Sequence, residues 1–174
     1  MEPFVLRKWR LEDAESLAEQ ANNIKIWNNV RDYFPHPYSL QDGKEYIGMV
    51  LSQSNPAVNL AIAVEGKAVG GVGMVIFNDV ERVTAEIGYW LGERYWGRGI
   101  MTGAVKQMSQ YVFQNFDVIK LFAPVFEFNT ASMRVLEKAG YQKEAILKKA
   151  AVKNGKIIDI HYYSLFKQTY HEKY

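Results

Sequence analysis

The stretch ERYWGRGIMTGAV at residues 93–105 contains residue types with a clear chemical use. Gly97 and Gly99 flank Arg98, after a strand-like apolar run and before an apolar pattern of helical period. A helix begins with unpaired N–H groups and a partial positive charge, and glycine lets an anion approach the backbone closely. The stretch is therefore built like a cradle for a diphosphate, with Arg94 and Arg98 adding positive charge. A plain glycine turn into the helix stays open as an alternative, because the spacing matches neither a dinucleotide fingerprint nor a P-loop.

Apolar periodicity predicts the elements that must position this stretch. Alternating and turn-bounded runs predict strands, and apolar stripes of helical period predict helices. The strand-helix-strand unit from residue 83 to 126 should be a parallel crossover, whereas the other strands are mostly sequential and antiparallel. The predicted fold class is therefore mixed α/β (α+β). The predicted strands are 4–10, 59–64, 68–77, 83–91, 118–126, 141–152 and 157–166, and the predicted helices are 11–23, 39–54 (capped by Ser39 or Asp42), 100–112 and 131–138.

The composition predicts one globular domain, residues 1–174, with 48% hydrophobic and 23% charged residues. The chain has no cysteine, which excludes disulfides and thiolate chemistry, and its three histidines show no metal-ligand spacing, so we expect no metal. The N-terminus MEPFVLRKWR lacks the apolar region of a signal peptide. No apolar run approaches the roughly 18 residues of a membrane span. We therefore expect a cytoplasmic protein without a membrane partner.

The net charge of +2 is unevenly distributed, with +4 in residues 141–174 and −2 in residues 1–140. A basic C-terminal part could favour an anionic ligand, but a solvated lysine face is the preferred interpretation. Nucleic-acid binders carry a denser basic stripe, so we expect no nucleic-acid partner.

Two segments together carry a resemblance to a known family. Residues 86–105, EIGYWLGERYWGRGIMTGAV, resemble the acetyl-CoA motif of the GNAT N-acetyltransferases, Gln/Arg-x-x-Gly-x-Gly/Ala, which Arg94 to Gly99 fill position by position. Residues 129–144, NTASMRVLEKAGYQKE, are similar to the family's Asn-x-x-Ser segment that ends in glycine and an aromatic residue. LRKWRLEDAE and VRDYFPHPYSLQD resemble the branch that includes the ribosomal-protein alanine N-acetyltransferases (the RimJ/RimL-like branch). The resemblance spans nearly the whole chain.

This resemblance implies a fold and a cosubstrate. The implied fold is a GNAT-type, mostly antiparallel sheet of about seven strands flanked by about four helices, with a central parallel pair, 83–91 and 118–126, that splays apart. Acetyl-CoA is the implied acetyl donor, and its pantetheine arm is expected to lie in the gap, where unpaired strand groups bind it. The residues implied to bind acetyl-CoA are Tyr89, Trp90, Leu91, Arg94, Gly97, Arg98, Gly99, Ile100, Met101, Thr102 and Asn129.

Glu86 and Ser132 are the candidate catalytic residues. Glu86 lies in the strand leading to the expected acetyl position, where relatives place an acid or a water-holding residue, and is the candidate base. Ser132 fills a position that the related alanine acetyltransferases keep close to the sulfur, so it is the candidate hydrogen-bond donor or proton relay. A salt-bridged surface glutamate and an ordinary first-turn helix serine are the respective alternatives. Many members of the family use a tyrosine in place of the serine. The nearest tyrosine after Ser132 is Tyr141, which is expected in the core.

Five aromatic residues of the segment before the second predicted helix are the candidate acceptor wall, because aromatics and rigid prolines suit a shaped pocket: Trp27, Tyr33, Phe34, His36 and Tyr38. The expected activity is transfer of an acetyl group to a primary amine by direct attack in a ternary complex. The branch resemblance favours a protein N-terminal amine. A polyamine, an amino sugar or an amino acid stays open as acceptor, as does a non-catalytic acetyl-CoA sensor. The chain is expected to be a monomer or a homodimer.

Overall fold

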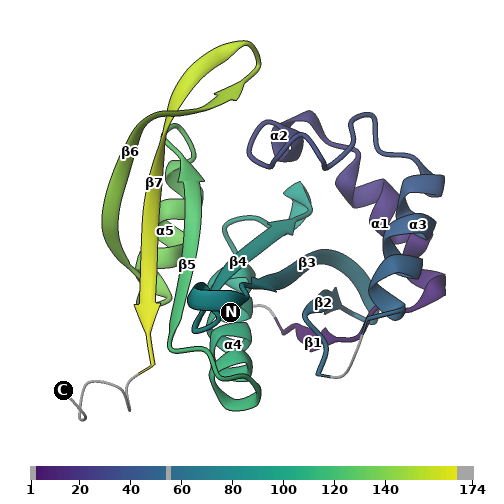
Figure 1. Ribbon diagram of the computed structural model, residues 1–174. Helices are drawn as coiled ribbons and strands as arrows, with labels where there is room; N and C mark the ends of the chain where they lie inside the picture. The colour runs from purple at the N-terminus through teal and green to yellow at the C-terminus, as the bar shows by residue number, and fades with distance from the viewer. Residues whose placement is uncertain (1–2, 54–55, 168–174) are drawn as a thin grey trace. The chain divides into compact units, whose positions relative to one another are not determined.

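The computed structural model describes residues 3–53 and 56–167, which form a mixed sheet with helices (Figure 1). The strands follow the order β1-β2-β3-β4-β5-β7-β6, and β4 and β5 form a parallel pair. The strands are β1 (Val5–Arg7), β2 (Asn59–Val64), β3 (Lys67–Ile76), β4 (Thr84–Leu91), β5 (Lys120–Phe126), β6 (Gln142–Lys153) and β7 (Lys156–Phe166). The α-helices are α1 (Ala14–Ala21), α2 (Ile24–Trp27), α3 (Leu40–Leu51), α4 (Ile100–Asn115) and α5 (Thr130–Lys138), and the 3-10 turns are η1 (Leu11–Asp13), η2 (Asp79–Glu81) and η3 (Glu93–Tyr95).

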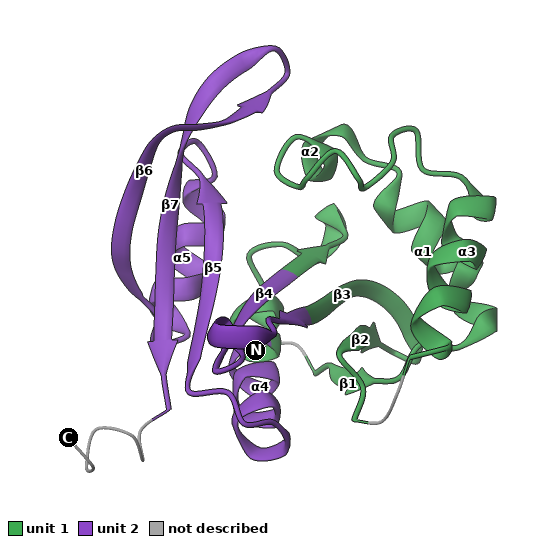
Figure 2. Cartoon of the chain, viewed as in Figure 1, with its two compact units in different colours: residues 1–73, 89–104 green, residues 74–88, 105–174 purple. Residues whose placement is uncertain are grey.

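The chain divides into two compact units (Figure 2). One consists of Met1–Gly73 and Tyr89–Ala104, and the other of Met74–Gly88 and Val105–Tyr174. β3, β4 and α4 each run from one unit into the other. The chain therefore passes between the units within regular secondary structure rather than through loose linkers.

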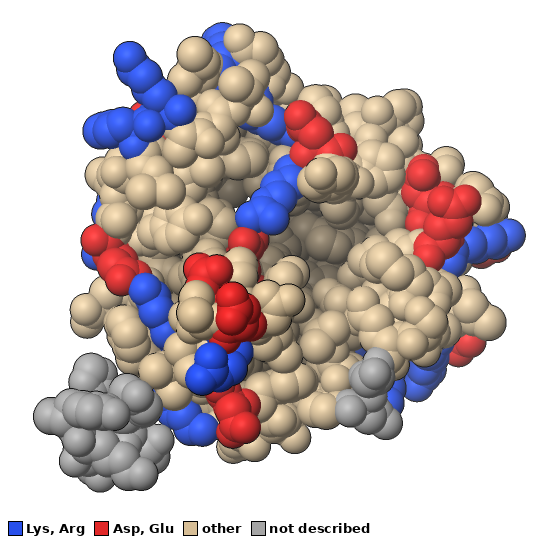
Figure 3. Space-filling model, in the orientation of Figure 1, with Lys and Arg blue, Asp and Glu red and all other residues tan. Residues whose placement is uncertain are grey.

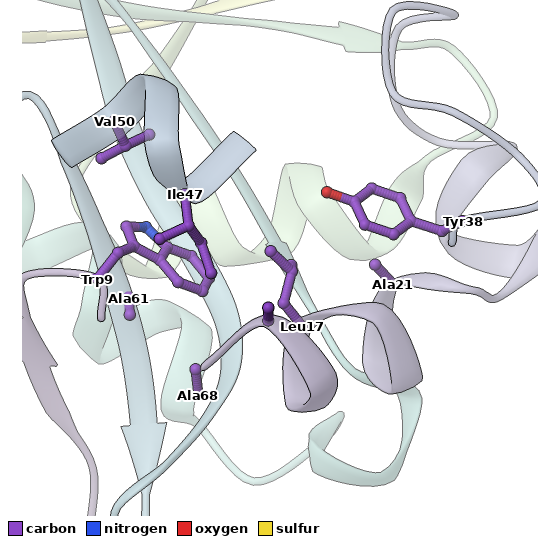
Figure 4. Packing of buried hydrophobic residues seen from close by; sticks show 9 residues of the cluster. Trp9, Leu17, Ala21, Tyr38, Ile47, Val50, Ala61 and Ala68 are labelled. Atoms are coloured by element: carbon purple, nitrogen blue, oxygen red, sulfur yellow. The ribbon is translucent and has the colours of Figure 1, made fainter. Parts of the chain in front are cut away.

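The first unit is built around one apolar cluster (Figure 4). Strands β1, β2 and β3 pair antiparallel, and helices α1 and α3 contribute their apolar faces. Trp9 is 2% exposed and is the largest fully buried side chain, and the ring of Tyr46 meets it edge-on with the ring centroids 5.6 Å apart. Burial of such side chains contributes about 1.5–3 kcal/mol each. The cluster consists of Trp9, Ala14, Leu17, Ala21, Tyr38, Ile47, Val50, Ala61 and Ala68.

The second unit contains a long antiparallel hairpin of β6 and β7, with β7 also pairing to β5. The hairpin turns at Asn154 and Gly155, whose φ angles of 51° and 71° are the left-handed values that a two-residue turn requires. The register of β6 shifts between Leu147 and Ala151. At this bulge Lys149 has a φ of 53°, and its N–H donates to the Asp159 carboxylate at 2.8 Å.

Most predicted elements are confirmed, and three details of the N-terminal region are corrected. The first strand ends at Arg7 rather than residue 10, because Trp9 turns its indole into the core. The first predicted helix opens with the 3-10 turn η1, where Asp13 accepts the Arg10 amide at 2.9 Å. The four-residue helix α2 was not predicted, because it is too short to show periodicity. No described helix has the length and apolarity needed to cross a membrane.

Acidic and basic side chains are interspersed over the face of the molecule shown in Figure 3. The electrostatic potential at any place on this face therefore depends on the few charged residues nearby, and the net charge of +2 says little about it.

Candidate functional site

The glycine-rich stretch leaves the end of β4 through a turn that is tied back to the sheet. The Gly92 N–H donates to the Val69 carbonyl at 2.8 Å, which continues the sheet contact one residue beyond β4. The Trp96 indole N–H then donates to the Leu91 carbonyl at 2.7 Å. These two hydrogen bonds hold both ends of η3 and set the direction in which the glycines follow.

Gly97 and Gly99 have φ angles of 75° and 79°, in the left-handed region that favours glycine. A Cβ added to Gly97 would meet no atom of the protein within 4 Å, so the space beside this backbone is open. Helix α4 follows at once, anchored by the fully buried Ile100. Its first hydrogen bond runs from the Gly103 N–H to the Gly99 carbonyl, at 3.1 Å, so the amides of 100–102 precede the hydrogen-bonded part of the helix. The predicted strand-glycine-helix geometry is thus confirmed.

Four of the predicted residues at this turn are exposed: Arg94, Gly97, Arg98 and Gly99. The Arg98 guanidinium lies over the Tyr95 ring, 5.6 Å from its centroid, and Arg94 forms a long ion pair with Glu19 at 3.6 Å. Ile100 and Met101 are buried, so their side chains anchor the helix, and Thr102 is half-buried. The groups of this stretch exposed to solvent therefore include the backbone of Gly97 and Gly99 and the side chains of the two arginines.

Strand β4 leaves its parallel partner early. The ladder with β5 contains three residue pairs, from Thr84–Lys120 to Glu86–Phe122, whereas β4 continues to Leu91. β5 continues to Phe126, paired with β7 on its other edge. Tyr89 and Trp90 are half-buried and Leu91 is buried. Among the described strands, the peptide groups of β4 beyond Glu86 therefore lie outside the β4–β5 ladder.

Glu86 is half-buried on β4 and shares a strand face with Gly88 and Trp90 by alternation. Ser132 lies in the first turn of α5, half-buried, and its N–H donates to Asn129 Oδ1 at 3.1 Å. Asn129 is therefore the N-cap of α5.

Tyr141 belongs to the core, as predicted. It is 2% exposed, and its hydroxyl lies 2.8 Å from the Ser109 Oγ. Burial raises the pKa of Tyr141 well above its usual range, against a smaller opposing effect of the Ser109 hydrogen bond. Its phenol is therefore held protonated in the interior.

The five residues of the candidate acceptor wall comprise two pairs of contacting rings and one exposed tyrosine. The Trp27 and His36 rings lie 5.7 Å apart, and Phe34 contacts Tyr38 at 5.0 Å between ring centroids. Tyr38 is 6% exposed and is part of the core cluster of the first unit. Tyr33 is 98% exposed. The structure thus brings four of the five aromatics into ring contacts and leaves Tyr33 extended into solvent.

Phe34 also meets Trp90 of β4, edge-on, with the ring centroids 5.8 Å apart. The sequence did not predict this contact between the aromatic segment and β4. The sequence feature related to it is the Gly70-Gly71 pair of β3, which leaves room for the Trp90 side chain. A Cβ on Gly71 would lie 3.0 Å from the Trp90 Nε1.

The fold and the site together define a class of protein: a mixed-sheet protein with a glycine turn at the start of a helix, a geometry that suits an anionic ligand. A family model for the acetyltransferase (GNAT) domain matches residues 4–142. The chain is 30% identical over 175 residues to an uncharacterized N-acetyltransferase, p20, of Bacillus licheniformis, an alignment that covers 97% of this chain and 96% of the relative. The chain belongs to the GNAT acetyltransferase family.

Two further similarities concern ligands and acceptors of other proteins. The crystal structure of Microcin C7 self immunity acetyltransferase MccE in complex with acetyl-CoA and AMP has a TM-score of 0.83 and 26% sequence identity to this chain, covering 96% of this chain and 94% of that one. A ribosomal-protein-serine acetyltransferase of Escherichia coli is 30% identical over 95 residues, which are 53% of each chain.

The donor of GNAT acetyltransferases is acetyl-CoA, and the residues present fit its diphosphate. The open space beside Gly97 admits a phosphate oxygen where a side chain would block it. The positive φ values of Gly97 and Gly99 and the helix start at Ile100 present successive amides. An anion at this place is further favoured by the partial positive charge of the N-terminus of α4.

Proposed function

We propose that this chain is a single-domain N-acetyltransferase that transfers the acetyl group of acetyl-CoA to a primary amine, with a protein N-terminal α-amine as acceptor. The observation that supports it most is the continuous unit of β4, glycine turn and α4, which presents backbone amides at an open surface. The partial similarity to a ribosomal-protein-serine acetyltransferase favours the protein acceptor. A ribosomal-protein acceptor would place the reaction in the cytoplasm.

The diphosphate of the donor is held by backbone N–H groups of 97–102, with Arg94 and Arg98 supplying positive charge. Peptide groups of Tyr89, Trp90 and Leu91, which lie on β4 beyond the three residue pairs of the β4–β5 ladder, run beside the pantetheine arm. Asn129 contributes its side-chain amide. Acetyl-CoA, when bound, supplies a thioester whose carbonyl is open to attack by an amine.

The chemistry required of the protein depends on the kind of amine. An α-amine has a pKa of about 7.7–8.0 and a lysine about 10.4, so deprotonation at pH 7 costs roughly 1 kcal/mol for the first and 4–5 kcal/mol for the second. Glu86, half-buried and one strand repeat from Gly88, accepts the amine proton directly or through a water. Ser132 donates a hydrogen bond to the departing sulfur. A weak base of this kind is sufficient for an α-amine, which favours that acceptor over lysine.

The aromatic segment from Trp27 to Tyr38 forms one wall of the acceptor site. Phe34, held between Tyr38 and Trp90, is its best-fixed member, and Trp27 and His36 form the adjoining pair. Tyr33, extended into solvent, contacts the parts of the acceptor that lie beyond its first residues.

A panel of amines tests this function by mass spectrometry of the products. We expect peptides with a free N-terminal serine or alanine to be acetylated on the α-amine, and the same peptides with a blocked N-terminus and an internal lysine to stay unmodified. Turnover of only polyamines or amino sugars would assign a small-molecule acceptor. Binding of acetyl-CoA without turnover of any amine would assign a sensor.

A matched pair of glycine variants shows whether acetyl-CoA binding depends on the cradle. Gly97 and Gly155 both have positive φ, and a Cβ at either meets open space. We expect Gly97→Asp to weaken acetyl-CoA binding by about tenfold or more, equivalent to roughly 1.4 kcal/mol. Gly155→Asp carries the same backbone strain at the β6–β7 turn and should bind as the unmodified protein does. Equal affinity of the two variants in calorimetric titration would remove the diphosphate from this turn.

A further inference from the structure

Three consecutive residues before the glycine turn, 92–94, are each contacted by residues of α1 or of the stretch that follows it. Glu19 pairs with Arg94 at 3.6 Å, and Gln20 packs so closely on Gly92 that an added Cβ would lie 2.3 Å from its Oε1. Between these two contacts lies Glu93. The turn that leads into the cradle is therefore held from one side by a short run of neighbouring residues.

Both carboxylate oxygens of Glu93 are engaged by this run. Lys25 Nζ donates to Oε1 at 2.5 Å and Asn23 Nδ2 donates to Oε2 at 2.8 Å. The hydrogen bonds from Lys25 and then Asn23 hold the pKa of Glu93 below its usual range, so the group is a carboxylate at neutral pH. Glu93 lies four residues before Gly97 in the chain, and the Lys25 ammonium offsets its negative charge.

Asn23 and Asn22 link this clamp to the aromatic segment. Asn23 Oδ1 accepts the Lys25 N–H at 2.8 Å, so the same side chain caps α2 and bonds Glu93. Asn22 Oδ1 accepts the Tyr38 N–H at 3.1 Å, at the far end of the segment. Two adjacent asparagines thus fix both ends of residues 24–38, and one of them is fixed to Glu93.

Glu93 is equally tied to the cradle through its backbone. Its carbonyl accepts the Trp96 N–H at 3.1 Å, one residue before Gly97. An anion that restrains the amides of 97–102 therefore also restrains the position of the Glu93 carboxylate.

We propose that Glu93 is a positioning residue that couples the occupied diphosphate cradle to the aromatic acceptor segment 24–38 through Asn23 and Lys25. Donor binding then orders the wall against which the amine is placed, and donor-loaded protein is the form that binds the acceptor well. This inference rests on the proposed function.

The clamp is suited to coupling rather than to holding the fold. The side chains of Lys25 and Glu93 are 63% and 38% exposed, and exposed ion pairs contribute little to global stability. Removing the carboxylate should therefore leave the protein folded and change only how the segment responds to the ligand.

Hydrogen exchange with coenzyme A as the probe tests this coupling without an identified acceptor. In the unmodified protein, saturating coenzyme A should slow exchange in peptides covering 93–104 and, by about fivefold or more, in peptides covering 24–38. Glu93→Ala should keep the slowing at 93–104 and lose it at 24–38. Glu93→Gln, which keeps the shape and one acceptor oxygen, should lose part of it. Glu12→Gln, which removes the exposed Arg10–Glu12 pair in the same unit, is the matched control and should respond as the unmodified protein does.

The outcomes separate the two proposals. No slowing at 93–104 in the unmodified protein would overturn the cradle and, with it, the proposed function. Slowing at 93–104 alone in the unmodified protein, or an unchanged response of 24–38 in both Glu93 variants, would overturn the coupling and leave the cradle standing. A merely structural Glu93 would change exchange of 24–38 in the free protein but not its response to coenzyme A.

Discussion

At the scale of single residues, the proposed chemistry depends on few polar side chains. Glu86 is half-buried, two residues before Gly88 on the same face of β4, and forms the last residue pair of the ladder with β5. Ser132 is fixed less by its hydroxyl than by its backbone, because Asn129 caps the helix on its N–H. Of the two, Glu86 is the residue whose replacement isolates a proton-transfer step.

Replacing Glu86 with glutamine should slow turnover by about 10²–10⁴-fold, because removal of a positioned base has effects of that size. Acetyl-CoA affinity should stay near that of the unmodified protein, and the pH profile of turnover should shift. Steady-state kinetics across pH, with calorimetric binding, makes the comparison. Glu81→Gln, an exposed carboxylate of η2, is the control. An unchanged rate would leave Glu86 as a structural strand residue.

Individual residues were predictable from the sequence where a local pattern determines them. The glycine turn between strand and helix at Gly97 and Gly99 and the burial of Tyr141 follow from short-range patterns and are confirmed. The Glu93 clamp was not predicted, because its partners lie about 70 residues away in the chain and the side chains are exposed and polar. Nothing in a local pattern distinguishes such a carboxylate from any solvated one.

At the scale of elements, two strands approach unusually closely where the proposed donor and acceptor sites adjoin. A Cβ on Gly70 of β3 would lie 2.5 Å from the Trp90 carbonyl oxygen and 3.0 Å from Leu91 Cδ1. Gly71 makes similar room for the Trp90 indole. The glycine pair therefore allows residues 90 and 91 of β4 to lie close to β3. It thereby fixes the position of Trp90, which contacts Phe34.

Gly70→Ala should lower the free energy of unfolding by about 1–3 kcal/mol, because a methyl group cannot be accommodated against a backbone oxygen without a shift of the strand. Gly48→Ala is the matched control: its Cβ meets open space in α3, so the variant should gain about 0.5–1 kcal/mol. Urea titrations of the three proteins give the values. Equal stability of Gly70→Ala and the unmodified protein would show that β4 does not depend on this close approach.

Elements with a complete local sequence signal were predictable, and the shortest elements were not. β2 was predicted with its observed ends, and Ser39, one of the two predicted caps of α3, is its N-cap, because each has a complete local signal. The short β1 and α2 depend on side chains that meet distant parts of the chain. Trp9 ends the strand by entering the core, and Asn23 starts the helix while bonding Glu93.

At the scale of the whole molecule, acid stability depends on the Arg7–Asp13 ion pair, whose arginine also bonds a third segment of the first unit. Arg7 donates to both oxygens of Asp13, at 2.6 and 2.7 Å, and also to the Gly66 carbonyl at 3.1 Å. Burial raises the pKa of Asp13, but the hydrogen bonds from Arg7 and from the Arg10 amide outweigh it, so the pKa lies below its usual range. A carboxyl group with a lowered folded pKa stabilises the protein above its unfolded pKa and loses this contribution as pH falls through the folded value.

Asp13→Asn should therefore cost on the order of 2 kcal/mol at neutral pH, the size of a hydrogen-bonded charged pair. The cost should shrink below about pH 4, where the unmodified protein loses the same interaction. Chemical denaturation at several pH values tests this, with Glu12→Gln as an exposed carboxylate control. A cost that stays constant down to pH 2 would show that Asp13 acts through packing alone.

The outer strand β6 has a consequence for how this protein behaves in a crowded solution. A bulge at Lys149, whose N–H bonds Asp159, shifts the register of this strand. Three lysines lie along the strand: Lys143, Lys148 and Lys149. An extended segment of another protein chain would therefore pair poorly with β6, because the strand is bent and carries positive charge. Two apolar side chains near the hairpin tip, Val152 and Ile157, are 63% and 66% exposed, but they lie beyond the bulge, so the strand resists growth into aggregates despite them.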